Sequence, residues 1–103
     1  MPIAYVTSPP DEESLQMASH VEQMLIDQDW TPQISPAMII DGVHTQAHHP
    51  PPRLVDHCLE ALRRAETLMA VGRWRSCELC RIEHAFAQQN GIICIEPAGD
   101  QLN

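Results

Sequence analysis

The sequence predicts a single α/β domain, Rossmann-like or flavodoxin-like, with three layers and a parallel sheet of about four strands. Short β-branched and aliphatic runs alternate along the chain with longer segments whose apolar residues recur at helical spacing. Such alternation is typical of parallel strands joined by right-handed crossovers, with helices on both faces of the sheet. The 103 residues, 44% of them hydrophobic, suffice for one modest core. One domain spanning residues 1–103 is therefore expected.

The first strand is expected at Ile3 to Thr7, a β-branched and aromatic run. Ser8 to Asp11 then provides a helix cap, with proline at the first helical position. A helix is predicted from Glu12 to Asp29, because the apolar positions recur at helical spacing and polar residues occupy the other face. The residues expected to face the core are Leu15, Ala18, Val21 and Leu25.

The next segment is harder to assign, because prolines interrupt an apolar stretch. Pro32 and Pro36 predict a short or irregular strand among its aliphatic residues, which are Ile34, Met38, Ile39 and Ile40. Residues Asp41 to Pro52 are rich in proline and histidine and show no periodicity, which indicates a surface loop.

The second half of the chain repeats the alternation. A helix is predicted from Arg53 to Ala65, a buried strand from Thr67 to Val71 and a turn from Gly72 to Ser76. A further helix is expected from about Cys77 to Asn90, with Leu79, Ile82 and Phe86 facing inward and Gly91 as a left-handed cap. The last strand is expected at Ile92 to Glu96.

The charge of the chain excludes one class of partner. Its net charge is -8 with only six Lys and Arg residues, whereas nucleic-acid binding depends on basic residues that displace counterions. No polynucleotide partner is therefore expected. A small anionic ligand remains compatible with the local cluster of Arg73, Arg75 and Arg81.

The chain is expected to be cytoplasmic and not to enter a membrane. No apolar stretch approaches the roughly 18 residues of a membrane helix, and no basic segment followed by a long apolar run begins the sequence. In that compartment the four cysteines, Cys58, Cys77, Cys80 and Cys94, are expected as reduced thiols.

The carboxyl ends of parallel strands are where ligands bind in this class of fold. The topology brings four segments to that edge: Thr7 to Pro10, Ala37 to Gly42, Gly72 to Cys77 and the turn after Glu96. Glu83 lies in the helix that leaves this edge, on one stripe with Cys80 and Ala87. A carboxylate there can act as a nucleophile or base, and the competing interpretation is a solvated surface glutamate.

The segment from Trp74 to Glu83, followed by an Ala-rich helix, a glycine and an Ile-rich strand, resembles a known family. It is similar to small phage and bacterial proteins related to nucleoside 2-deoxyribosyltransferases, in which a glutamate follows a tryptophan by nine residues. The opening PIAYVTSPP and the stretch LVDHCLEALRRAETLMAV also resemble this family. The resemblance thus covers nearly the whole chain.

The resemblance implies N-glycosidic transfer or hydrolysis of a nucleoside or nucleotide, with Glu83 as the nucleophile that attacks the anomeric carbon. The residues implied to line the sugar and base pocket are Tyr5, Ser8, Trp74, Ser76 and Cys77. No cofactor and no metal are expected. Because related transferases complete their sites across subunits, a homo-oligomer is expected as well.

The sequence departs from the family pattern at four positions. Cys58 stands where the transferases carry an aspartate, Cys77 stands at the motif serine, Leu79 at the motif glycine and Ser8 at the glycine of the first turn. These departures favour a competing class, a non-catalytic nucleotide-binding or protein-interaction module of the same fold.

The pair Cys77-x-x-Cys80 at the start of a helix suggests a third class, a redox site. A metal site is the related alternative, because thiolates and imidazoles are common ligands. The further ligands would come from His44, His48, His49 and His57.

Overall fold

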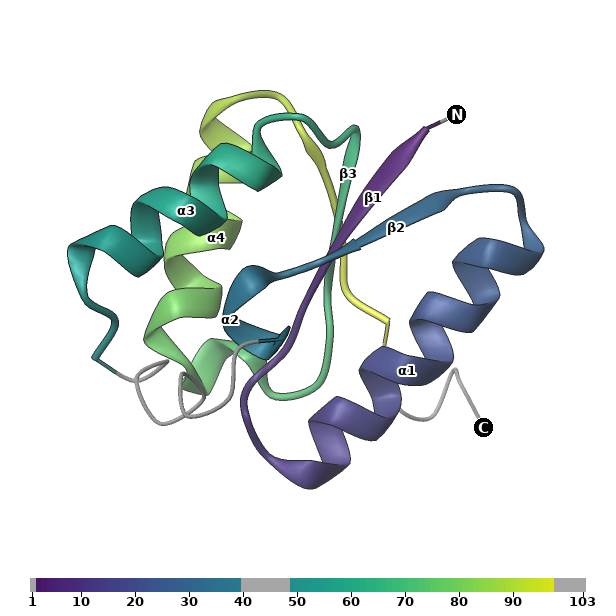
Figure 1. The fold of residues 1–103 in the computed structure, drawn as a ribbon, viewed down its shortest axis with the longest axis horizontal. Coiled ribbons are helices and arrows are strands. Elements are labelled where there is room, and N and C mark those ends of the chain that lie inside the picture. The colour runs from purple at the N-terminus through teal and green to yellow at the C-terminus, as the bar shows by residue number, and fades with distance from the viewer. Residues whose placement is uncertain (1, 40–48, 98–103) are drawn as a thin grey trace.

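The computed structural model describes residues 2–39 and 49–97 of the chain. Figure 1 shows the elements in order. They are β1 (Ile3–Thr7), α1 (Glu12–Asp27), β2 (Thr31–Ile34), α2 (Pro36–Ile39), α3 (Pro52–Leu62), β3 (Thr67–Ala70), the 3-10 turn η2 (Trp74–Ser76), α4 (Glu78–Gln89) and β4 (Ile93–Ile95).

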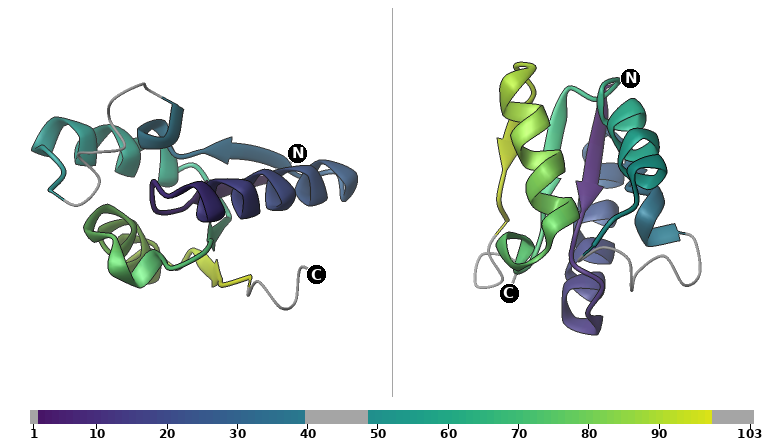
Figure 2. Two further views of the ribbon diagram at one scale, coloured as in Figure 1. Left: turned by 90° about the horizontal axis from the view of Figure 1, so that it is seen from below. Right: turned by 90° about the vertical axis from the view of Figure 1, so that its left-hand side faces the viewer.

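The four strands form one parallel sheet in the order β2-β1-β3-β4, which confirms the predicted α/β class. Helix α1 covers one face, and α3 and α4 cover the other (Figures 1 and 2). The alternation of side chains along central strand β1 divides the core accordingly. Ala4 and Val6 pack with α1, whereas Tyr5 packs with Leu62 of α3 and Ala87 of α4.

Helix α1 begins one residue after its cap, Asp11, whose carboxylate accepts hydrogen bonds from the backbone N–H and the hydroxyl of Ser14. The prediction of a proline inside the first turn was wrong, because Pro9 and Pro10 precede the cap. The helix ends at Asp27 and buries Ser14 and three of the four predicted positions, leaving Leu15 half-buried.

The irregular second segment contains a strand and a short helix. Strand β2 ends at Ile34, and Met38 lies in α2 instead of in a strand as predicted. Pro36 is the first residue of α2, where its missing N–H is not needed. Pro32 is tolerated within β2 because β2 is an edge strand of the sheet.

Helix α3 and strand β3 follow the sequence pattern closely. Leu54, Cys58 and Leu62 are buried along α3, and every residue of β3 is buried. A strand buried on both faces is the arrangement expected in the middle of a parallel sheet. Gly91 has φ +72, as predicted for a left-handed residue after a helix.

Helix α4 is rotated relative to the prediction. Its buried residues are Leu79, Cys80, Glu83 and Ala87, whereas Ile82 and Phe86 are only half-buried. The core side of this helix is therefore displaced by about 100°, the angle between consecutive residues. As a result, a glutamate occupies a core position.

Strand β4 forms the other edge of the sheet and is only three residues long. Ile93 is 63% exposed and Ile95 44% exposed. Most of the predicted loop from Asp41 to Pro52, with His44 and His48, lies outside the described residues. Within residues 2–39 and 49–97, no helix combines the length and apolar character needed to cross a membrane.

Candidate functional site

Glu83 lies in the second turn of α4, and its side chain is fully buried against the carboxyl ends of the strands. Its Oε2 accepts a hydrogen bond from the Tyr5 hydroxyl and another from Ser35 Oγ at 3.1 Å. Its Oε1 accepts one from Thr7 Oγ1 at 2.6 Å. Three hydroxyl groups thus fix both carboxyl oxygens, so the solvated-surface interpretation of Glu83 was wrong.

The sequence places these donors through strand geometry. Tyr5 and Thr7 are two residues apart in β1, so both side chains point to the face covered by α4. Ser35 immediately follows β2, and its N–H donates to Val6 O at 2.8 Å, which holds it beside β1. The carboxylate therefore lies over two neighbouring strands.

Burial controls the proton affinity of this group. It raises the pKa of Glu83 above its ordinary value, although the hydrogen bonds from Thr7, Tyr5 and Ser35 oppose that rise. Burial, together with the Glu83 carboxylate, also raises the pKa of Tyr5, which therefore stays a donor. In the hydrogen bond between Tyr5 and Glu83, the proton therefore stays on the Tyr5 hydroxyl.

Two thiols border this hydroxyl–carboxyl cluster. Cys80 Sγ lies 3.5 Å from Thr7 Oγ1, and Cys58 Sγ lies 3.7 Å from Ser35 Oγ. Both cysteines are buried, and burial raises the pKa of Cys58. Cys58 thus stays a neutral neighbour of the carboxyl group.

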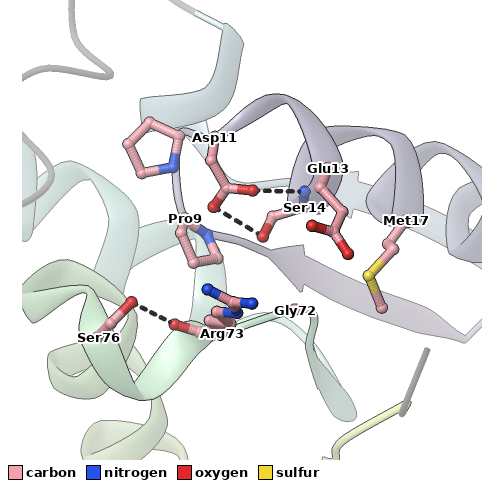
Figure 3. A pocket seen from close by; sticks show the side chains of 9 residues that line it. Pro9, Asp11, Glu13, Ser14, Met17, Gly72, Arg73 and Ser76 are labelled. Atoms are coloured by element: carbon pink, nitrogen blue, oxygen red, sulfur yellow. Dashed lines mark hydrogen bonds between the residues drawn. The ribbon is translucent and has the colours of Figure 1, made fainter. Parts of the chain in front are cut away.

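A cavity of about 650 Å³ opens at the carboxyl edge of the sheet (Figure 3). One side of the cavity is formed by the loop that follows β1 and by the start of α1. The other side is formed by the loop that follows β3. These two loops leave adjacent strands toward opposite faces, which makes this the topological switch point of the sheet. The lining residues are Pro9, Pro10, Asp11, Glu13, Ser14, Met17, Gly72, Arg73 and Ser76.

The floor of the cavity depends on a glycine. Gly72 has φ +69, and a Cβ atom there would lie 2.4 Å from Ser14 Oγ. Only glycine permits both this backbone conformation and the close approach of the β3 loop to α1. Nearby, Ser76 Oγ donates to the carbonyl of Arg73 at 2.7 Å and stabilises the turn that carries the arginine.

The cavity combines both signs of charge. Although partial burial opposes the effect, the hydrogen bonds from Ser14 hold the pKa of Asp11 below its ordinary value, and Arg73 contributes in the same direction. Asp11 therefore remains a carboxylate beside the arginine (Figure 3). Glu13 adds a second carboxyl group to the lining.

The structure separates Glu83 from this cavity. Glu83 lies with Tyr5 and Thr7 on the face covered by α4, whereas the cavity includes Ser14 and Met17 of α1, which covers the other face. Glu83 is not among the residues that line the cavity. The sequence-predicted nucleophile and the switch-point cavity are thus two distinct features.

The predicted substrate-binding residues fall into separate places. Tyr5 contacts Glu83, and Ser76 lines the cavity. Ser8 is buried, and its hydroxyl donates to Pro9 O at 3.1 Å. Cys77 is buried in a core cluster with Cys58 and Cys80. Of these five residues, only Ser76 lines the cavity.

Trp74 has a packing role that the sequence did not reveal. The residue is 6% exposed, and its ring stacks on the ring of His84 with centroids 4.2 Å apart. Its Nε1 donates to Glu96 Oε1 at 3.0 Å, and Arg75 pairs with the same carboxylate at 2.8 Å. These contacts hold η2 against α4 and against the segment that follows β4.

Sequence reasoning missed Thr7 and Ser35 as partners of Glu83, and Asp11 and Ser14 as cavity residues. Thr7 could have been found, because it shares the face of Tyr5 along β1. Ser35 could not, since its position depends on where β2 ends.

Comparison of this chain with protein-family models, with curated proteins and with solved structures finds no significant match. Among the described residues, no three His, Cys, Asp or Glu side chains lie close enough together to hold a metal ion.

Proposed function

We propose that this chain binds a nucleoside or nucleotide in the switch-point cavity. The observation that carries the proposal is the place of this cavity, between the loops that follow β1 and β3 in a parallel sheet. Ligands of α/β domains bind at this position, and a volume of about 650 Å³ falls in the range of small-molecule sites.

The lining chemistry supports this class of ligand. Arg73 offers a cation for a phosphate, and the hydroxyls of Ser14 and Ser76 offer donors and acceptors. The carboxyl groups of Asp11 and Glu13 can accept hydrogen bonds from sugar hydroxyls. A ligand that carries both hydroxyls and a phosphate matches this mixture better than a purely anionic one.

Calorimetric titration with a panel of nucleosides and nucleoside monophosphates tests the proposal. We expect saturable binding of at least one monophosphate, weakened about tenfold or more by Arg73→Gln because a charged contact is lost. Arg64→Gln is the matched control, because Arg64 is an exposed arginine of the opposite edge, near Glu60 at 3.8 Å. Absence of binding across the panel, or equal losses in both variants, would overturn the proposal.

N-glycosidic chemistry through Glu83 is a second candidate function, favoured by the three hydroxyls that orient its carboxyl group. In this reaction the carboxylate bonds to the anomeric carbon while the base leaves with the electron pair of its glycosidic bond. Water or another base then releases the sugar. The resemblance to nucleoside 2-deoxyribosyltransferases supports the same assignment.

This reaction requires the sugar to reach a side chain that is fully buried. Chromatographic detection of free base after long incubation with deoxynucleosides and their monophosphates measures it directly. We expect base release that disappears in Glu83→Gln and persists in Glu66→Gln, which changes an exposed glutamate. If the folded wild-type chain releases no base, the catalytic candidate is refuted and the binding function stands by itself.

A further inference from the structure

Cys77 and Cys80 lie one helical turn apart at the start of α4. Cys77 is the residue that precedes the helix, with φ -110 and ψ 121, and its carbonyl accepts from the N–H of Arg81 at 3.1 Å. Residues three apart at this position are neighbours on one side of a helix. A spacing of one helical turn is compatible with the roughly 4.4–6.8 Å between Cα atoms that a disulfide spans.

The two thiols also share one environment. Cys77 is 0% exposed and Cys80 1% exposed, and both belong to a buried cluster that includes Trp74 and Leu79. The side chains of Cys77 and Cys80 interact, and each shifts the pKa of the other. Because the two residues lie one helical turn apart in the same buried cluster, a bond between them requires little movement of the backbone.

The start of the helix distinguishes the two thiols. The Cys80 side chain and the backbone N–H groups of Leu79 and Cys80 hold the pKa of Cys77 down, to about 7. Its hydrogen bond to Cys77 and its burial instead raise the pKa of Cys80. The charge of Glu83, on the same helix, acts in the opposite direction and raises the pKa of Cys77. From α3, the residue of this cluster with an ionisable side chain is Cys58. Cys77 is thus the thiol suited to attack, and Cys80 the one suited to resolve.

We propose that Cys77 and Cys80 are a reversible dithiol–disulfide pair that a peroxide oxidises. The Cys77 thiolate attacks one oxygen of hydrogen peroxide, the O–O bond breaks, and hydroxide leaves and takes up a proton to become water. The sulfur of Cys80 then attacks the sulfenic acid, loses its proton and expels a second water as the S–S bond forms. A dithiol reductant reverses the change by thiol–disulfide exchange.

Access to the buried pair would come through η2, the short turn that immediately precedes Cys77 and whose Trp74 belongs to the same buried cluster. Arg75 and Ser76 in this turn are exposed, and the contacts of Trp74 with His84 and Glu96 hold it in place. Opening of so short a segment is a local event and does not require global unfolding. Oxidation also acts next to the buried carboxyl group, because Cys80 contacts Thr7, a donor to Glu83.

Treatment of the folded full-length chain with hydrogen peroxide tests the proposal. Intact mass should fall by two hydrogen atoms, and peptide mapping should identify a bond between Cys77 and Cys80 that a dithiol reductant removes. The rate should rise about tenfold per pH unit below about pH 7 and level off above it, because the Cys77 thiolate is the attacking species. Glu96→Gln, which loosens η2, should increase the rate.

The control variants separate this pair from the other cysteines. In Cys80→Ser the bond should not form, and Cys77 should instead gain oxygen. The double variant Cys58→Ala and Cys94→Ala should form the bond as the wild type does. Oxidation confined to half-buried Cys94, a bond involving Cys58, or reduced thiols throughout in a chain whose circular dichroism remains native would each overturn the proposal.

Discussion

Replacement of Glu83 by glutamine should change the pH dependence of stability more than stability itself. Glutamine keeps the size of the side chain and a carbonyl oxygen for Tyr5 and Thr7, and its amide N–H groups can donate to hydroxyl oxygens. It does not ionise. The variant therefore removes one buried titration and leaves the packing of α4 against the sheet in place.

The sign of the effect follows from the raised pKa. Glu83 binds its proton more tightly in the folded chain than in the unfolded chain, where its ordinary value is 4.5. Its contribution to stability is complete below that value and is lost as the pH rises toward the folded pKa. Within this window the wild type should lose about 1.4 kcal/mol per pH unit relative to Glu83→Gln.

Urea unfolding followed by circular dichroism, from about pH 5 to about pH 8, measures this difference. Glu66→Gln is the matched control, because it removes a carboxyl group that is exposed. The difference between wild type and Glu83→Gln should widen with pH, and the difference for Glu66→Gln should stay nearly constant. Parallel curves for wild type and Glu83→Gln would refute the assignment of a raised pKa to Glu83.

Three further predictions can be measured by the same unfolding assay. Tyr5→Phe should destabilise the chain by about 1–3 kcal/mol, because it removes a buried donor to Glu83 Oε2; an unchanged free energy of unfolding would contradict this. Gly72→Ala should cost about 2 kcal/mol or more through its positive φ and the clash with Ser14, and a neutral effect would contradict the cavity geometry. Asp11→Ala should cost about 1 kcal/mol as a lost helix cap, whereas Asp11→Asn should recover most of it.

Much of the fold was predictable because hydrophobic periodicity is a local property of the chain. The strands at Ile3–Thr7 and at β3, and the helices α1 and α3, follow from apolar spacing and end within three residues of their predicted limits. The segment around Pro36 failed because its aliphatic residues suit either a strand or a helix, and short apolar runs do not decide between them.

The candidate site was predictable only in part. The spacing from Trp74 to Glu83 drew attention to a glutamate that the structure buries, but periodicity assigned the core side of α4 to Ile82 and Phe86. Glu83 can be buried because three hydroxyls from other elements donate hydrogen bonds to its carboxyl group. These donors lie 48 to 78 positions away in the sequence, so a pattern that ranks residues by hydrophobicity cannot reveal them. The packing of Trp74 was missed for a similar reason, because its partner Glu96 lies 22 positions away in the sequence.

The sequence by itself therefore determined the class of fold, the alternation of elements, the edge of the sheet at which the cavity opens and the thiols at the start of α4. Only the tertiary structure decided that Glu83 lies on one side of the sheet and the cavity on the other. The physical reason is that a strand sends successive side chains to opposite faces, while the crossovers choose which helix covers each face. Tyr5 and Thr7 consequently meet α4, and the loops that follow β1 and β3 enclose a separate space beside Ser14.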